Sequence, residues 1–234
     1  MPPPEVYEAE YDFWPWGRLL NSLAEWVVCE APQQAVVVDY MCGTGRLLHL
    51  VSQKRPDLKL FGCDISKEYV NYGQAKYGRV HLEVADALTH QPSEKPDMII
   101  CAAGIHHLSP PNQSIFVRKA AKELTVGGLF IVGEEVVRGW SDERDRRGAV
   151  LELSVALLDD LIANSAPDEQ IEAAVGMLKR DLFQIGEFKS SLDEMLTLLR
   201  SRFCIKRLVH VWPADGRPFG DYLLCANPGN QQTL

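Results

Sequence analysis

The stretch VVVDYMCGTGRLL, residues 36–48, decides the fold of this chain. Its first half is a run of valines, which is typical of a strand buried on both faces of a parallel sheet. Its second half places Gly43 and Gly45 between that run and an apolar helix that begins near Arg46. Glycines at a helix N-terminus let a ligand approach the backbone. The stretch therefore predicts a strand, a ligand-binding loop and a helix.

Strand and helix patterns alternate along the rest of the chain. Helices are expected around Trp16 to Glu30, at 46–54, after Ser66, at 111–124 and at 191–202, and strands at 35–41, 58–65, 80–88, 98–104 and 128–134. Such alternation indicates a doubly wound parallel sheet. Two further strands, 203–212 and 219–226, are joined by a turn and predict an antiparallel hairpin. The fold class is therefore α/β, with a mostly parallel seven-stranded sheet.

The length of 234 residues favours a single domain, residues 1–234, with a helical segment over residues 1–34. Residues 140–188 interrupt the alternation with two amphipathic helical stretches, 145–164 and 167–185. We interpret this segment as a helical cap inserted in the domain. A helix pair that merely covers an edge of the sheet is an equally good interpretation of the same pattern.

Composition excludes several classes of function. With 24 basic and 32 acidic residues the formal net charge is −8, so a nucleic-acid-binding surface is not expected. The six cysteines form no CxxC pair, and the chain shows neither a signal-peptide pattern nor an apolar stretch fit to span a membrane. We therefore expect a cytoplasmic protein without a membrane partner. The sequence does not indicate an oligomeric state.

Two kinds of nucleotide loop fit the glycines of residues 43–45. The dinucleotide fingerprint GxGxxG would need a third glycine where Leu48 stands. An NAD(P)-binding oxidoreductase is therefore the weaker alternative. The second kind is the loop that holds S-adenosylmethionine.

Several motifs in register support the second kind, namely VVVDYMCGTGRLL, FGCDIS, VADAL and PDMIICAAGIHHL. Over roughly residues 35–135 the chain resembles the class I S-adenosylmethionine-dependent methyltransferases of the small-molecule type. The resemblance implies that Asp39 orients the amino group of the cofactor and that the loop from Met41 to Gly45, with Gly43, lies against its methionine portion. The chain departs from the family at Met41, where glycine is usual.

The resemblance also assigns the adenosyl end of the cofactor. Asp64 stands 19 positions after Gly45, close to the spacing of about 20 at which a carboxylate accepts ribose hydroxyls. Asp64 is thus expected at the ribose with Ile65 beside it, although an aspartate before Ser66 also fits the start of a helix. Asp86 is expected at the adenine amino group and Ala87 at the ring.

In the family that the chain resembles, the fourth motif ends beside the methyl group that is transferred, so the resemblance implies that Ala103, His106 and His107 lie at the site. Either histidine could act as the general base, because an imidazole pKa near about 6.5 suits removal of a proton at neutral pH. The alternative is that they shape the pocket or bind backbone. No metal site is expected, because adjacent side chains diverge and no third ligand stands at a recognisable spacing.

Other residues are candidates for the walls of the site. Glu134 and Phe188 are expected to contact the substrate, and Tyr11, followed by Asp12, matches a pair that closes over the cofactor in relatives. The fourth motif lacks the Pro-Pro-aromatic sequence of base-modifying relatives. We therefore expect O- or N-methylation of a small molecule, of the kind found in secondary metabolism, yielding S-adenosylhomocysteine. A protein that binds S-adenosylmethionine without methylating is a further alternative.

Overall fold

The computed structural model describes residues 2–229 and confirms the α/β fold. Its strands form one sheet in the order β3-β2-β1-β4-β5-β7-β6. The strands are β1 Val36–Tyr40, β2 Lys59–Asp64, β3 His81–Val84, β4 Met98–Ala102, β5 Leu129–Val136, β6 Phe203–Trp212 and β7 Gly220–Pro228. Strands β1 to β5 pair in parallel, whereas β7 runs antiparallel to both β5 and β6. The closing hairpin is therefore present as expected.

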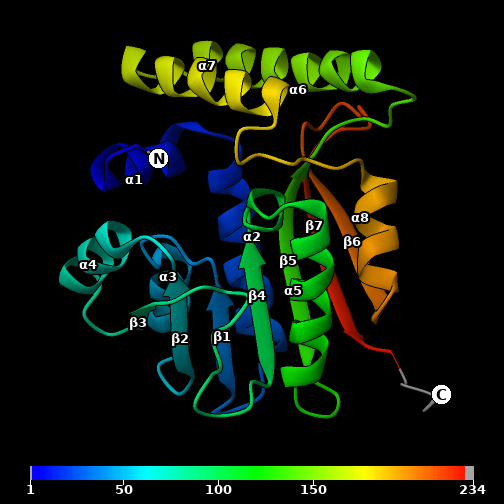
Figure 1. Ribbon diagram of the computed structural model, residues 1–234. Coiled ribbons are helices and arrows are strands. Elements are labelled where there is room, and N and C mark those ends of the chain that lie inside the picture. Colours follow the sequence, from blue (N-terminus) through cyan, green and yellow to red (C-terminus); the bar gives the residue numbers. More distant parts are fainter. Residues whose placement is uncertain (1, 230–234) are drawn as a thin grey trace.

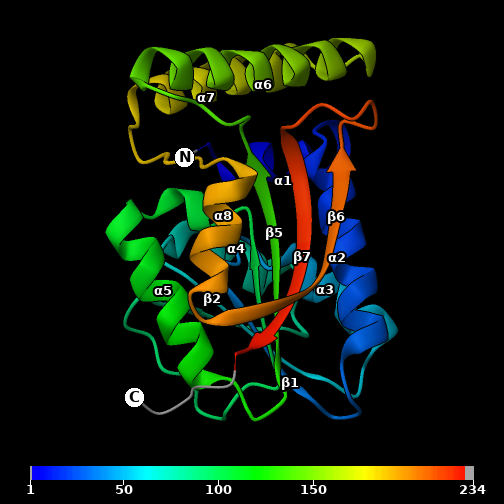
Figure 2. The ribbon, with the colours of Figure 1, turned by 90° about the vertical axis from the view of Figure 1, so that its right-hand side faces the viewer.

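Helices cover both faces of the sheet (Figure 2). On one face α2 (Trp16–Glu30), α3 (Arg46–Lys54) and α4 (Lys67–Lys76) share an apolar core with Val37 of β1. On the other face α5 (Pro110–Glu123) and α8 (Leu192–Arg200) share a core with Val36 and Val38. Neighbouring residues of a strand point to opposite faces, so burial on both faces explains the uninterrupted valine run.

The N-terminal segment contains a helix before the one expected around Trp16 to Glu30. Helix α1 (Pro4–Phe13) precedes α2, and Pro4 stands at its first position, where a proline is well tolerated. Trp14 Nε1 donates a hydrogen bond of 2.7 Å to Gln170, and the Gln170 amide donates to the carbonyl of Val6. The end of α1 is therefore tied to the helical insertion.

The insertion consists of α6 (Glu143–Ala163) and α7 (Asp168–Phe183). The strand arrows of β4 and β5 point toward these two helices, which lie across the end of the sheet and not along its edge (Figure 1). A third apolar core joins α6 and α7 to Val137, which follows β5, and to Trp212, the last residue of β6. The insertion is therefore a cap. The division into domain residues 1–234, segment 1–34 and cap 140–188 stays a prediction.

Two strands end earlier than expected. Strand β3 stops at Val84 instead of Leu88, and β4 stops at Ala102, after which Ile105–His107 form a single 3-10 turn. Ala103 leaves the extended region with φ +49°, although its N–H still donates to Gly133 of β5. The two histidines therefore lie on a tight helical turn and not on a strand. Within residues 2–229 no helix has the length and apolar character needed to cross a membrane.

Candidate functional site

The carboxyl ends of β1 and β4 mark the point where the strand order of the sheet reverses. The chain goes on from β1 to α3 on one face and from β4 to α5 on the other. In open α/β sheets, ligands bind in the crevice at this switch point. Two residues there have left-handed backbones, Met41 with φ +59° and Ala103 with φ +49°. Such strain in residues other than glycine collects at functional sites, and it also explains why a glycine would suit position 41.

The carboxylate of Asp64, at the end of β2, is hydrogen-bonded to residues 41–45, the glycine loop between β1 and α3. One of its oxygens accepts a hydrogen bond of 2.9 Å from the N–H of Gly43, and the other accepts one of 2.8 Å from the N–H of Ser66. Burial raises the pKa of Asp64, and these two N–H groups oppose the rise. Each oxygen keeps a second lone pair for a ligand hydroxyl. Asp64 therefore lies beside the glycine loop and also directly before the helix that begins after Ser66. Its position agrees with both interpretations of the sequence.

Asp39, in β1, offers an unsatisfied carboxylate to the same crevice. The residue is buried, and its Oδ1 atom has no hydrogen-bond partner among residues 2–229. Burial and the nearby Asp64 raise its pKa well above the usual range. A buried polar atom without a partner costs free energy, which a positively charged ligand group would recover.

The ends of β2 and β3 carry the residues expected around the adenosyl group. Asp64 and Val84 are paired across these strands, so Ile65 and Asp86 follow them at the same edge. The side chain of Ile65 is 71% exposed, which is unusual for isoleucine, and Asp86 is exposed as well. Ala87 is buried. This edge thus presents an apolar side chain together with a carboxylate.

Helix α1 covers the glycine loop, and Tyr7 is the side chain of α1 that lies on it. A Cβ atom added to Gly43 would lie 2.6 Å from the Tyr7 hydroxyl, which shows how closely this side chain lies on the loop. The hydroxyl of Tyr11 donates to that of Tyr7, and the Tyr11 ring packs under the guanidinium of Arg46. Tyr7 therefore lies directly on the loop with Tyr11 next to it, and the contact of Tyr11 with the cofactor stays a prediction.

His106 lies in the buried part of the site and is bonded to Glu134 of β5. Its Nδ1 shares a short hydrogen bond with Glu134, whose other oxygen accepts one of 2.9 Å from the N–H of Ile105. Burial alone would lower the pKa of His106, but the charge and hydrogen bond of Glu134 outweigh it and raise that pKa. Glu134 has no exposed surface. Glu134 therefore binds His106 and the N–H of Ile105, and its contact with a substrate stays a prediction.

His107 and His106 converge on a third residue, Glu187, which follows α7. The two imidazole centroids are 4.2 Å apart, because the 3-10 turn holds both rings on one side. Glu187 Oε2 lies 3.4 Å from His106 Nε2 and 3.2 Å from His107 Nδ1. The expectation that these adjacent side chains diverge is therefore wrong. Glu187 is buried, whereas the His107 side chain is 46% exposed.

The segment after α7 is fastened to the sheet beside these histidines. The N–H of Phe188 donates a hydrogen bond of 2.7 Å to the carbonyl of His106. The buried Lys189 Nζ contacts both oxygens of Asp181 at 2.8 Å and Glu135 at 3.2 Å. Burial would lower the pKa of Lys189, but the surrounding carboxylates, Glu135 first, outweigh it and raise that pKa. The segment after α7 is therefore attached to the sheet by a backbone hydrogen bond and by the ion pairs of Lys189.

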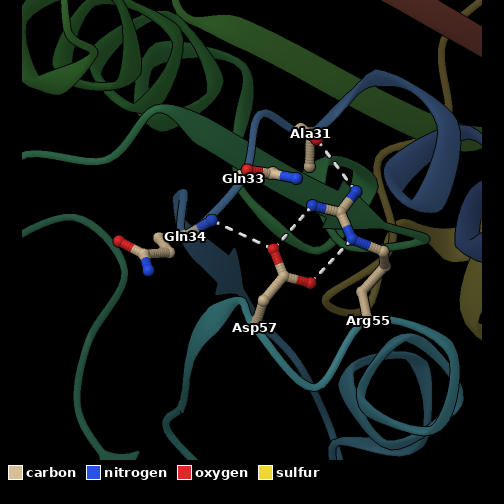
Figure 3. Close-up of a pocket in the computed structure, with 5 residues that line it drawn as sticks. All are labelled: Ala31, Gln33, Gln34, Arg55 and Asp57. Carbon is tan, nitrogen blue, oxygen red and sulfur yellow. Dashed lines mark hydrogen bonds and ion pairs between the residues drawn. The ribbon is translucent and has the colours of Figure 1, made fainter.

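A polar hollow at the opposite end of the molecule is not part of this site. It is lined by Ala31, Gln33, Gln34, Arg55 and Asp57, which precede β1 and β2 (Figure 3). Asp57 accepts hydrogen bonds from Arg55 and from the N–H of Gln34. Since ligands of such sheets bind at the carboxyl ends, this hollow has no support as the functional site.

Sequence reasoning missed Glu187 although it named the neighbouring Phe188. No short-range spacing connects residue 187 to the histidines, since β5 and the whole cap separate them along the chain. A weak signal was available in the run Gly186-Glu187-Phe188-Lys189, where charged residues interrupt the return from the cap. The run could not be linked to the histidines from the sequence, because only the fold brings Glu187 next to them.

Comparison with known families gives one match that covers the glycine loop. Residues 37–128 match the family described as "Methyltransferase domain". The matched range contains β1 to β4 and both histidines. It ends before β5 and the cap.

Curated proteins of similar sequence match over a comparable part of the chain. A carboxy-S-adenosyl-L-methionine synthase of Campylobacter lari is 27% identical over 126 residues, which cover 52% of this chain and 53% of that protein. A trans-aconitate 2-methyltransferase of Methylobacterium radiotolerans is 30% identical over 106 residues, covering 45% of this chain and 39% of that protein. The matches thus span about half, or less, of the length of these relatives.

Solved structures extend the likeness of fold to nearly the whole chain. The N-methyltransferase NodS of Bradyrhizobium japonicum, in complex with S-adenosyl-L-homocysteine, has a TM-score of 0.62 at 12% identity. The match covers 93% of this chain and 89% of that one. The fold, including the antiparallel strands at the C-terminal side of the sheet, is that of class I methyltransferases.

Proposed function

We propose that the protein is an S-adenosylmethionine-dependent methyltransferase acting on a small molecule. The match of residues 37–128 to the family described as "Methyltransferase domain" supports this proposal. The observation that carries the proposal is the carboxylate of Asp39, which is buried without a hydrogen-bond partner beside a glycine loop at the switch point of the sheet. The cofactor carries an ammonium group that such a carboxylate would bind.

The residues at the crevice fit the rest of the cofactor. The loop from Met41 to Gly45, with Gly43 tied to Asp64, would lie along its methionine portion, and Ala103 would line the opposite wall. Asp64 would accept the ribose hydroxyls through its free lone pairs. Around the adenine we place Ile65, Asp86 and Ala87. Tyr7, with Tyr11 behind it, would close the site from α1.

The acceptor would bind between the histidines and the cap. His106 donates from Nδ1 to Glu134, so its unprotonated Nε2, which faces Glu187 at 3.4 Å, would remove a proton from an acceptor hydroxyl. His107 is half-exposed and would line the pocket, with Phe188 at its wall. A cap lying over the strand ends favours a small, enclosed acceptor, methylated on oxygen or nitrogen as in secondary metabolism.

The two alternative functions differ from this proposal in their ligand or in the reaction. An NAD(P)-dependent oxidoreductase is disfavoured, because Leu48, at the position of the third glycine, is fully buried and packs on Gly62. A protein that binds S-adenosylmethionine without transferring its methyl group is favoured by one observation, the similarity to carboxy-S-adenosyl-L-methionine synthase. Methyl transfer to any acceptor would exclude that second alternative.

A thermal-shift comparison of S-adenosylhomocysteine with a reduced nicotinamide dinucleotide tests the cofactor. At a hundred times its dissociation constant, the true ligand adds about 2.7 kcal/mol, or about 5 to 10 °C for a chain of this size. We expect S-adenosylhomocysteine alone to shift the transition. A shift with the dinucleotide alone would replace the proposal with the oxidoreductase.

The variant Asp64→Ala tests the placement of the cofactor. It should weaken S-adenosylhomocysteine binding by about 1 to 3 kcal/mol in a calorimetric titration, because the ribose and the Gly43 N–H lose their acceptor. Asp57→Ala is the matched control, since Asp57 also accepts a backbone N–H but at the other end of the sheet. Equal affinities for Asp64→Ala and the wild type would remove Asp64 from the site.

We further propose a reducing compartment, the cytoplasm, as the location. The cysteines of the described chain are all unpaired, and Cys42, Cys63, Cys101 and Cys225 are buried in the apolar cores. The acidic net charge supports a small-molecule partner over a nucleic acid.

A further inference from the structure

Glu187 presents a buried carboxylate oxygen with no hydrogen bond to the two histidines. The residue is 5% exposed, and its Oε2 atom has no hydrogen-bond donor in suitable geometry within residues 2–229. Yet this oxygen lies 3.4 Å from His106 Nε2 and 3.2 Å from His107 Nδ1. Leaving a charged oxygen buried without a hydrogen bond is costly. The arrangement therefore calls for a cation between the three side chains.

The spacing of these three atoms matches the coordination of a metal ion. Tetrahedral zinc binds nitrogen and oxygen ligands at about 2.0 to 2.2 Å, which puts neighbouring ligand atoms roughly 3.3 Å apart. The oxygen-to-nitrogen distances of 3.2 and 3.4 Å fall at this separation. All three ligand atoms lie within 4.8 Å of one another. An ion could enter with small movements of the side chains.

The surroundings orient two of the three ligands, His106 and Glu187, as a metal site requires. The third, His107 Nδ1, lies 3.4 Å from the carbonyl oxygen of Gly186 and would give up this contact to bind an ion. Glu134 accepts from His106 Nδ1, which leaves the Nε2 lone pair directed at Glu187. A carboxylate behind a histidine is the usual second layer of a zinc site. Arg180 Nε lies 3.3 Å from the other oxygen of Glu187, so Oε2 is the atom that remains for an ion.

We propose that His106, His107 and Glu187 bind a divalent transition-metal ion of the zinc type, with one coordination position left open. Two histidines and one carboxylate form the protein ligand set of catalytic zinc sites and of several iron sites. Because the His107 side chain is 46% exposed at the carboxyl end of β4, the open position would face that side. An oxygen atom of the methyl acceptor would bind there, and this second statement rests on the proposed function. With the ion bound, His106 would serve as its ligand, and the ion would take over from His106 Nε2 the role of easing proton loss from the acceptor.

A purely structural role for the cluster is the alternative that the experiment must exclude. In that alternative a charged His106 sits between Glu134 and Glu187 and fastens the segment after the cap to the sheet. Such an ion pair needs no metal. It would therefore leave the protein without a saturable metal site.

The test is a titration of chelator-treated, metal-free protein with Co²⁺, followed by visible absorbance, with Zn²⁺ as the competitor. We expect one equivalent of Co²⁺ to bind with the absorption of a four- or five-coordinate ion and to be displaced by Zn²⁺. Glu187→Gln and His107→Ala should weaken binding by about 100-fold or more, and Glu134→Gln by about 10- to 100-fold. His90→Gln is the matched control, because His90 pairs with Glu83 at 2.7 Å but belongs to no such three-ligand group in the described chain.

The outcomes separate this inference from the proposed function. Absence of saturable Co²⁺ binding, or equal affinity in the wild type and in His107→Ala, would overturn the metal site. His107→Ala keeps the test valid if a buried variant fails to fold, since His107 is half-exposed. Calorimetric titration of the same samples with S-adenosylhomocysteine tests the proposed function independently. Metal binding without S-adenosylhomocysteine binding would refute the function and leave the site standing.

Discussion

The glycine loop after β1 and the junction between the cap and strands β4 and β5 lie at the same end of the sheet, but they are held by different forces. In the loop, backbone approaches backbone, with Gly73 of α4 against the carbonyl of Thr44 and Gly43 bonded to Asp64. At the junction, buried charges meet, with Lys189 between Asp181 and Glu135. We expect the loop to be sensitive to added atoms and the junction to be sensitive to lost charge.

The largest effect is expected at the junction, from Lys189→Met. This change leaves the buried Asp181 and the partly buried Glu135 without their cation, and an uncompensated buried charge costs about 3 to 5 kcal/mol. Urea denaturation would measure the fall in the free energy of unfolding. Lys179→Met, on the exposed side of α7, is the control and should change it by less than about 0.5 kcal/mol. A loss below 1 kcal/mol in Lys189→Met would mean that buried charge does not hold the junction.

Helix α1 joins the two regions, because Tyr7 lies on the glycine loop while Glu10 faces Arg180 of the cap. Burial raises the pKa of Glu10 to about 8, and the charge of Arg180 opposes the rise. A charge on Glu10 would in turn raise the pKa of the nearby phenols of Tyr7, Tyr11 and Tyr69. Glu10 is therefore held in its neutral form at neutral pH.

The second prediction uses this raised pKa. Between the usual value of 4.5 and about 8 the folded state binds more protons at Glu10 than the unfolded state, so stability falls as the pH rises through this range. Glu10→Gln, which is neutral at every pH, should remove this fall and gain about 4 kcal/mol over the wild type near pH 8. Denaturation midpoints of both proteins from pH 5 to pH 9 would measure it. Parallel pH profiles would show that Glu10 is charged in the fold.

The sequence predicted the loop region well, because its determinants are close together along the chain. The valine run, the glycines after it and Asp64 follow one another in a single strand, loop, helix and strand, so their spacing alone placed them at one edge. Even the departure at Met41 proved informative, since its φ of +59° is a conformation that glycine adopts more easily.

The junction could not be predicted in the same way, because its partners come from distant segments. His106 and Glu187 meet only after β5 and the cap have folded back over the strand ends. The orientation of the histidines also depended on a local detail, the left-handed backbone of Ala103 that ends β4 and starts a 3-10 turn. No periodicity in the sequence signals such a turn.

The smallest effect is expected in the loop region, from Gly73→Ala. An added Cβ atom would lie 2.0 Å from the carbonyl oxygen of Thr44, so α4 or the loop must move, and overpacking of this kind costs about 1 to 3 kcal/mol. Because Thr44 stands between Gly43 and Gly45, the same change should weaken S-adenosylhomocysteine binding. Thermal unfolding and calorimetric titration of one sample would measure both effects.

Gly176→Ala is the matched control, since Gly176 is also helical but has open space at its Cβ position. There alanine should stabilise the fold by roughly 0.5 to 1 kcal/mol, because it favours the helix over the unfolded chain. The two substitutions are chemically identical, so opposite signs would isolate the close approach of α4 to the loop as the cause. If Gly73→Ala were also stabilising and bound the ligand normally, the loop would tolerate added atoms, and its contrast with the charged junction would fail.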